Sequence, residues 1–168
     1  LDSGMTSDLL TRVPSTFRAR INDVLLTALV LAVTAWSESA VRGGRPALTL
    51  DLEGHGREPL DAAADLTRTV GWFTSLFPVH LDAGDIDLTE AMAGGSDAGQ
   101  ALKRIKEQLR TLPHAGVGYG LLRYLDDEGQ AALGGTADPQ IAFNYLGRFG
   151  RPRNAPFAPA DTYSAVFG

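Results

Sequence analysis

The densest group of ionisable side chains lies in one short run, Glu53-Gly54-His55-Gly56-Arg57-Glu58, in which four of the six residues are ionisable. The run follows an alternating stretch, so Glu53 is expected where a strand ends and a glycine-flanked turn begins. Glycines allow the backbone to approach a ligand closely. A carboxylate there could move a proton at a carbon next to a carbonyl group, and Arg57 could hold that carboxylate or a substrate oxygen. Taken alone, a strand-end glutamate is more often an exposed turn residue.

Two common kinds of cofactor chemistry have little support in the sequence. No spacing typical of metal ligands joins the three histidines, so no metal site is expected at His55, His80 or His114. Pyridoxal phosphate needs a buried lysine for its Schiff base. The chain has only two lysines, and both lie off the apolar stripe of the helix expected around them. Lys103 and Lys106 are therefore predicted to be solvated.

Three other features are weaker candidates. The glycine-rich run 116–120 resembles a phosphate-binding loop only superficially, because position 121 is a leucine and no complete GxGxxG motif results. Asn144 lies among apolar neighbours, where a buried amide must find hydrogen-bond partners. Tyr119 and Tyr145 are more often packed aromatics with a satisfied hydroxyl than catalytic groups. The residues by themselves indicate no more than a candidate proton-transfer site around Glu53.

The elements that would position these residues follow from apolar periodicity. A buried helix is expected over 21–36, with Asn22 or Asp23 as its cap, and an amphipathic helix over 96–112, capped by Ser96 or Asp97. The segment between residues 82 and 96 is expected to be mostly irregular. Strands are expected over 48–53, 72–79 and 141–146, and Pro78 indicates an edge strand or a strand end.

Composition narrows the functional class. An apolar fraction of 44% in 168 residues suits one domain or one lobe of a larger domain. The net charge is −5 with scattered basic residues, so nucleic-acid binding is not expected. The most apolar stretch, residues 24–33, is too short to cross a bilayer, and no membrane partner is expected. The absence of cysteine fits a reducing cytoplasm.

Five blocks, in order, resemble those of the epimerization domains of non-ribosomal peptide synthetases, which belong to the condensation-domain superfamily. The blocks are NDVLLTAL at 22–29, EGHGRE at 53–58, RTVGWFTSLFP at 68–78, PHAGVGYG at 113–120 and FNYLG at 143–147. The resemblance covers roughly positions 20 to 150 of the chain.

The resemblance implies an α/β fold, half of a two-lobed fold similar to chloramphenicol acetyltransferase, with a mixed sheet covered by helices. The implied reaction is inversion from L to D at the α-carbon of an aminoacyl or peptidyl thioester. No cofactor intrinsic to the domain is implied, since the substrate hangs from the 4'-phosphopantetheine of a partner peptidyl carrier domain. By match to the family blocks, the implied catalytic residues are Glu53, Arg57, Asn144 and Tyr145. The implied substrate-channel residues are His55, Trp72 and Tyr119.

The resemblance also implies that a partner lobe is needed. The family's other acid–base group lies in an HHxxxDG motif of the N-terminal lobe, and this chain has no adjacent pair of histidines. Residues 1–168 are therefore expected to form a C-terminal subdomain, incomplete at its end and without the N-terminal lobe, that is inactive alone.

Two alternatives remain open. A condensation domain shares the fold and forms peptide bonds, but its blocks usually lack EGHGRE and have Val-Asn-Thr where Thr74-Ser75-Leu76 stand here. A non-catalytic docking or scaffold lobe is the other alternative, although a scaffold would need neither Glu53 nor Tyr145.

Overall fold

The computed structural model describes residues 1–37, 45–57, 65–135 and 138–147. Glu58, the last residue of the run that begins at Glu53, lies outside these residues. The elements are α1 (Ser3–Leu10), α2 (Arg12–Phe17), α3 (Ile21–Trp36), β1 (Ala47–Gly54), β2 (Ser75–Asp82), α5 (Leu88–Met92), α6 (Ser96–Arg110), the 3-10 helix η1 (Pro113–Gly116), α7 (Gly118–Leu125), α8 (Asp127–Leu133) and β3 (Ala142–Phe143).

The described strands form one mixed sheet in the order β2-β1-β3. β1 pairs with β2 antiparallel, so that Gly54 lies opposite Ser75, and with β3 parallel, so that Leu52 lies opposite Phe143. β2 is therefore an edge strand among the described elements, which agrees with the expectation drawn from Pro78. The mixed α/β class expected from the resemblance is confirmed.

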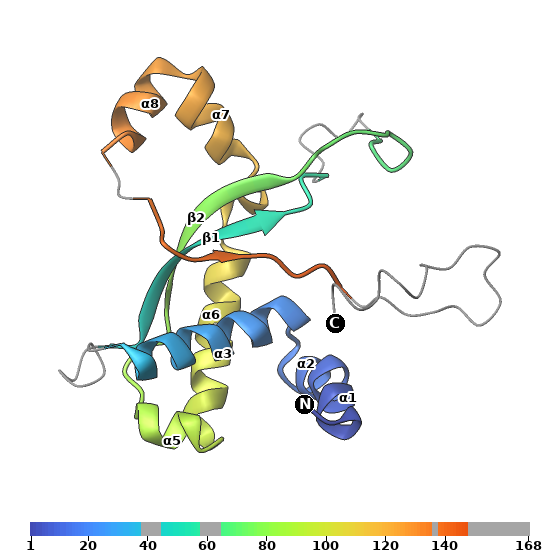
Figure 1. Ribbon diagram of the computed structural model, residues 1–168, viewed down its shortest axis with the longest axis vertical. Helices are drawn as coiled ribbons and strands as arrows, with labels where there is room; N and C mark the ends of the chain where they lie inside the picture. The colour runs from blue at the N-terminus through green and yellow to red at the C-terminus, as the bar shows by residue number, and fades with distance from the viewer. Residues whose placement is uncertain (38–44, 58–64, 136–137, 148–168) are drawn as a thin grey trace, which may run out of the picture.

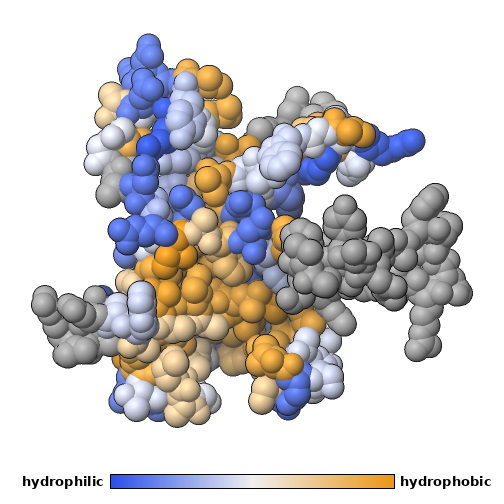
Figure 2. Space-filling model, viewed as in Figure 1, coloured by the Kyte–Doolittle hydropathy of each residue, from blue (hydrophilic) through white to orange (hydrophobic). Residues whose placement is uncertain are grey.

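The sheet separates two groups of helices. In Figure 1, α3, α5 and α6 lie below the strands, and α7 and α8 stand above them. The main core fills the lower side, where Leu50 and Leu81 of the strands pack with residues of α3 and α6. Figure 2 shows hydrophobic side chains gathered over this same region. The alternation predicted for β1 is borne out, because Leu50 is fully buried there whereas Thr49 is exposed on the opposite face.

Two expectations about helix α6 are wrong. Neither Ser96 nor Asp97 caps it by a side chain; instead Glu90 accepts hydrogen bonds from the Ser96 and Asp97 backbone N–H groups, each at 2.7 Å. A carboxylate from the preceding helix satisfies donors that the helix itself cannot. Lys106 is buried, not solvated, because its Nζ donates to the Phe17 carbonyl at 3.1 Å and pairs with Glu107 at 3.3 Å.

Two expectations about the strands also need correction. The second strand begins at Ser75 and not at Trp72. The segment between residues 82 and 96 is mostly irregular, as expected, and contains the short helix α5, capped by Asp87. The glycine-rich run ends in helix α7, whose packing against β2 and α8 compensates for the low helix propensity of glycine. Only Ala142–Phe143 of the last expected strand pairs with β1.

No single helix in the described part of the chain is both long and apolar enough to cross a membrane. Ser3–Phe17 and Ile21–Trp36 reach the required length and composition only together, and a bend of 100° separates them.

Candidate functional site

A cavity of about 390 Å³ lies where the end of β1, the first turn of α3 and the segment after β3 meet. We call it the Glu53 cavity. Its polar and aromatic lining comes from four separate parts of the chain: Arg20, Asn22 and Asp23; Glu53 and His55; Thr74 and Phe77; and Asn144 with Tyr145. Its apolar wall includes Leu26, Leu52 and Leu112.

The parallel pairing of β3 with β1 explains why distant residues meet in this cavity. Leu52 is in register with Phe143, so the chain that follows each of them runs in the same direction. Glu53 therefore emerges beside Asn144 and Tyr145, although these residues are far apart in the sequence. Asn144 is exposed and not buried, which corrects the expectation drawn from its apolar neighbours.

Glu53 is half-buried at the end of β1. Within the described residues, no hydrogen bond or ion pair engages its carboxylate. A carboxylate that no neighbouring donor or cation holds is available to accept a proton from a bound molecule.

Gly56 allows the turn after Glu53 to pack closely against a neighbouring segment. Gly56 has φ of +65°, and a Cβ there would lie 1.5 Å from the carbonyl oxygen of Phe73. No other residue fits so close to that backbone. The turn after Glu53 is therefore fixed against the segment around Phe73, which brings the second and third family blocks into contact.

The structure separates Arg57 from the expected proton-transfer group. Arg57 stacks on the Phe73 ring, with Cζ 4.3 Å from the ring centroid, and its Nη1 donates to the Leu66 carbonyl. Among the described residues it forms no ion pair with Glu53 and does not line the cavity. His55 does line the cavity, and its Nδ1 accepts from the Arg57 backbone N–H at 3.2 Å. The catalytic role expected of Arg57 remains a prediction.

The other two expected channel residues lie outside the Glu53 cavity. Trp72 is 91% exposed. Tyr119, on α7, lines a different cavity. Their roles in a substrate channel also remain predictions.

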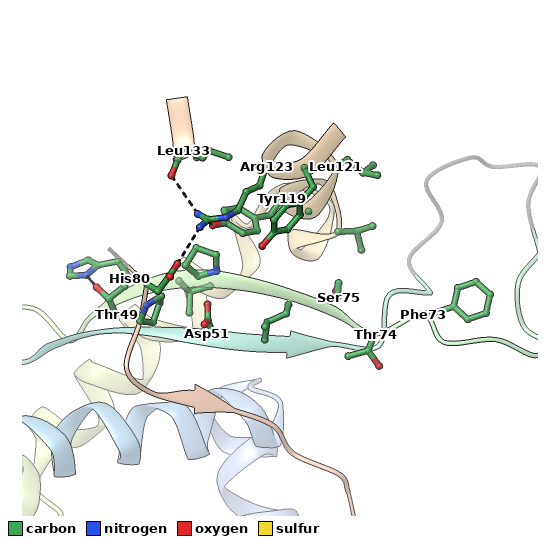
Figure 3. A pocket seen from close by; sticks show the side chains of 18 residues that line it. Thr49, Asp51, Phe73, Thr74, Ser75, His80, Tyr119, Leu121, Arg123 and Leu133 are labelled. Carbon is green, nitrogen blue, oxygen red and sulfur yellow. Dashed lines mark hydrogen bonds and ion pairs between the residues drawn. The ribbon is translucent and has the colours of Figure 1, made fainter. Parts of the chain in front are cut away.

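This second cavity, of about 700 Å³, lies on the opposite face of the sheet, and we call it the Arg123 cavity (Figure 3). Thr49, Asp51 and His80 line it from the strands, and α7 supplies Tyr119 and Arg123. Asp51 therefore does not share the Glu53 cavity, although alternation predicts that both carboxylates lie on one face. The strand ends at Gly54, and Glu53 turns toward a different cavity at that end.

The guanidinium of Arg123 is held by other groups of the protein. The Arg123 guanidinium donates to the Tyr119 hydroxyl at 3.0 Å, to the Leu133 carbonyl at 3.4 Å and to Asp138 at 3.2 Å (Figure 3). The hydrogen bond with Tyr119 raises the pKa of Arg123 above its usual value. Across the strands, the hydroxyl of Thr49 and Nδ1 of His80 are hydrogen-bonded at 2.9 Å.

Sequence reasoning missed the contribution of α3. The sequence predicts Asn22 and Asp23 only as helix caps, yet both line the Glu53 cavity. Asp23 does bond back to the helix start, because it accepts from the Arg20 backbone N–H at 2.7 Å. The Oδ1 atom of Asn22 is buried and has no hydrogen-bond partner among the described residues. The only available sequence signal is the presence of this segment in the first family block.

Comparisons with known proteins agree with the resemblance. A family model described as the condensation domain matches residues 1–164. A linear gramicidin synthase of Brevibacillus parabrevis is 46% identical over 153 residues, which cover 90% of this chain and 3% of that protein. Surfactin synthase subunit 1 of Bacillus subtilis (strain 168) is 40% identical over 145 residues, which cover 86% of this chain and 4% of that protein.

One solved structure extends the comparison to the fold. It is the epimerization domain from the third module of tyrocidine synthetase B, which is similar with a TM-score of 0.68 and 39% identity. The match covers 87% of this chain and 29% of that one. The chain therefore spans only a small part of the curated relatives and less than a third of the solved one.

Proposed function

The chain belongs to the condensation-domain family, and on that premise we propose that it is part of the C-terminal lobe of an epimerization domain in a non-ribosomal peptide synthetase. The domain inverts the α-carbon of an aminoacyl or peptidyl thioester from L to D while the substrate is attached to a carrier protein. The EGHGRE run and the likeness to a solved epimerization domain support epimerization over the other reactions of the family.

The observation that carries the proposal is the gathering of Glu53, Asn144 and Tyr145 around one cavity. The cavity contains a carboxylate to move a proton, and an amide and a phenol to donate hydrogen bonds. Proton transfer next to a thioester needs both kinds of group, because negative charge develops on the carbonyl oxygen as the proton leaves.

In the proposed reaction, the Glu53 carboxylate accepts the α-hydrogen as a proton. The electron pair of the broken C–H bond moves toward the thioester carbonyl, whose oxygen becomes negatively charged. Asn144 and Tyr145 donate hydrogen bonds to that oxygen. A group on the opposite face of the substrate then returns a proton to the α-carbon, which inverts its configuration. The same two groups act in exchanged roles in the reverse direction.

The opposite group belongs to the HHxxxDG lobe, which we propose is the partner of residues 1–168 in the complete domain. Glu53 is the residue before the last of β1 and lines the Glu53 cavity, and the second lobe would face it there across the substrate. In this arrangement epimerization needs both lobes, and neither lobe alone can catalyse it.

The residues around the Glu53 cavity are compatible with a phosphopantetheine arm. The arm is a chain of methylene and methyl groups that carries two amides, and it delivers the acyl group as a thioester. Leu26, Leu52 and Leu112 offer an apolar wall for such a chain.

The test is an α-hydrogen exchange assay with the two-lobed domain and a carrier loaded with an aminoacyl thioester in deuterated water. We expect deuterium at the α-carbon and a mixture of L and D products. The 168-residue chain alone is expected to give no exchange, because it lacks the opposite group. Turnover by the isolated chain would contradict the two-lobe mechanism.

The same assay separates the alternatives. With a second, acceptor-loaded carrier present, amide formation without α-exchange would identify a condensation domain and overturn the proposal. If neither reaction occurs, the proposal is contradicted and the docking or scaffold alternative is favoured.

A further inference from the structure

Two side-chain oxygens in the described residues are buried without a hydrogen-bond partner, and they belong to residues that line different cavities. They are Oγ of Ser75, beside the Arg123 cavity, and Oδ1 of Asn22, beside the Glu53 cavity. Burying a polar atom without a partner is unfavourable, so each such atom in a folded protein needs an explanation.

The local structure of α3 does not use the Asn22 oxygen. Its neighbours in the first turn are engaged within the helix: Asp23 accepts from the Arg20 N–H at 2.7 Å, and the Thr27 hydroxyl donates to the Asp23 carbonyl at 2.7 Å. The start of the helix is therefore stabilised without the Asn22 side chain; Asn22 lines the cavity, and its buried amide oxygen has no partner among the described residues.

The chemistry of the cavity indicates which group Asn22 could bind. Asn144 and Tyr145 offer donors for the thioester oxygen, and Glu53 takes the α-proton, as proposed above. A substrate of this class also carries a nitrogen on the α-carbon, either as an α-ammonium or as a peptide N–H. A carbonyl oxygen can accept from such a group but cannot stabilise an anion.

We propose that Asn22 is a positioning residue whose Oδ1 accepts a hydrogen bond from the N–H on the α-carbon of the substrate. The inference rests on the proposed function. Holding the nitrogen fixes the rotation about the bond between the carbonyl carbon and the α-carbon, which directs the α-hydrogen toward Glu53. The domain would therefore require an α-nitrogen and reject a simple acyl thioester.

The test uses the two-lobed domain and Asn22→Leu, which is similar in size but has no acceptor. The first readout is binding of a carrier whose thioester is replaced by an unreactive amide. We expect affinity for the aminoacyl form to fall roughly tenfold or more. Affinity for the desamino form, with hydrogen in place of the α-nitrogen, should not change. Equal losses for both forms, or no loss for either, would overturn the inference.

A second variant distinguishes the two sources of the N–H. Asn22→Asp keeps an acceptor and adds a negative charge, so it should bind an α-ammonium at least as well as the wild type does. It should gain nothing with an N-acylated, peptide-like substrate. Failure of Asn22→Asp to preserve binding of either substrate would count against an acceptor role.

Stability provides the control for a purely structural role. Asn22→Leu removes an unsatisfied buried oxygen, so the thermal midpoint should be unchanged or higher while affinity falls. The matched control is Ser75→Ala, which removes the other unpartnered oxygen and should leave affinity and exchange unchanged. A fall in the midpoint of Asn22→Leu that accounts for its loss of binding would assign Asn22 to the fold and overturn the inference.

The test of Asn22 can fail without the proposed function failing. Absence of α-exchange by the wild-type domain would refute the proposed function. Normal exchange by both the wild type and Asn22→Leu, with unchanged KM, would refute only the role of Asn22.

Discussion

The Glu53 cavity and the Arg123 cavity lie at the same two strands but differ in how their charged groups are held. In the Arg123 cavity the guanidinium bonds to a phenol, a carbonyl and a carboxylate of the protein. In the Glu53 cavity, within the described residues, the Glu53 carboxylate and the Asn22 oxygen have no partner. The Arg123 cavity also has groups without a partner among the described residues, the Asp51 carboxylate and the Ser75 hydroxyl, so the cavities differ chiefly in the guanidinium that the protein holds.

This difference indicates which cavity is suited to chemistry. A charged group already held by three partners stabilises the packing of α7 and α8, and a ligand would have to compete with those bonds. A polar group without a protein partner can form a hydrogen bond with a ligand without breaking one within the protein. The proposed mechanism therefore assigns proton transfer to the smaller of the two cavities.

The largest effect is expected from one of two matched substitutions on β1, which together test whether the two cavities differ in function. Glu53→Gln removes the proton acceptor with little change in shape, so α-hydrogen exchange by the two-lobed domain should fall by about 10²–10⁴-fold. Asp51→Asn makes the same chemical change two residues earlier, in the Arg123 cavity, and should have little effect. Comparable losses in the exchange rates of both variants would mean that the two cavities are not functionally distinct.

Two glycines of one family block test the packing on the two sides. Gly116 has φ of +82°, and a Cβ there would lie 2.3 Å from the ring of Phe77, which lines the Glu53 cavity. Gly116→Ala should lower the free energy of unfolding by about 2–4 kcal/mol. Gly120, beside the Arg123 cavity, has no atom within 4 Å of a Cβ.

Because Gly120 lies inside α7, Gly120→Ala should stabilise the domain by about 0.5–1 kcal/mol. Denaturant unfolding of the two-lobed domain measures both variants. A stable Gly116→Ala variant would show that the close approach to Phe77 is not needed.

Substitution of one tyrosine in each cavity tests the same difference with a smaller expected effect. Tyr145→Phe removes a hydroxyl from the Glu53 cavity and should lower the exchange rate roughly tenfold, because one donor to the developing negative charge is lost. Tyr124→Phe removes a hydroxyl beside the Arg123 cavity and should leave exchange unchanged. Single-turnover rates with the same loaded carrier measure both; an unaffected Tyr145→Phe variant would exclude its hydroxyl from the reaction.

The smallest expected effect concerns a carboxylate that lines neither cavity. Burial alone would raise the pKa of Asp82, but this is outweighed by bonds from the Gly84 N–H at 2.7 Å and the Arg104 guanidinium at 2.8 Å. The pKa of Asp82 therefore lies below its usual value in the folded state.

Because the folded protein binds this proton less tightly than the unfolded chain does, Asp82 stabilises the fold above about pH 4, near the unfolded pKa. That contribution is lost as the pH falls through the lower folded pKa. Asp82→Asn should make unfolding less dependent on pH below about pH 4 and leave exchange at neutral pH unchanged. Acid unfolding curves of the two proteins provide the measurement, and identical curves would contradict the expectation.

Local patterns predicted much of the fold. The alternation of β1 and the apolar stripe of α6 were visible because each records one face of one element. The errors occurred where a distant group supplied the decisive contact. Glu90 caps α6, and the Phe17 carbonyl holds Lys106, and neither contact has a signature in the neighbouring residues.

In the candidate site, too, the sequence predicted some features and only the tertiary structure revealed the others. Residue types marked Glu53, Asn144 and Tyr145 as chemically interesting, and the family blocks gave their order. Nothing local indicated that Arg57 would stack on Phe73, or that Tyr119 would line a cavity on the opposite face of the sheet from Glu53. Those outcomes depend on the path of the loops and on the side of the sheet that α7 covers.

The sequence by itself determined which side chains are available and how the short elements alternate, since side-chain chemistry and periodicity are local properties. Only the tertiary structure decided which of those side chains meet. The parallel pairing of β3 with β1 brings Asn144 and Tyr145 to Glu53, and the packing of α3 adds Asn22. Such pairing depends on hydrogen bonds and burial between distant segments, which no local period encodes.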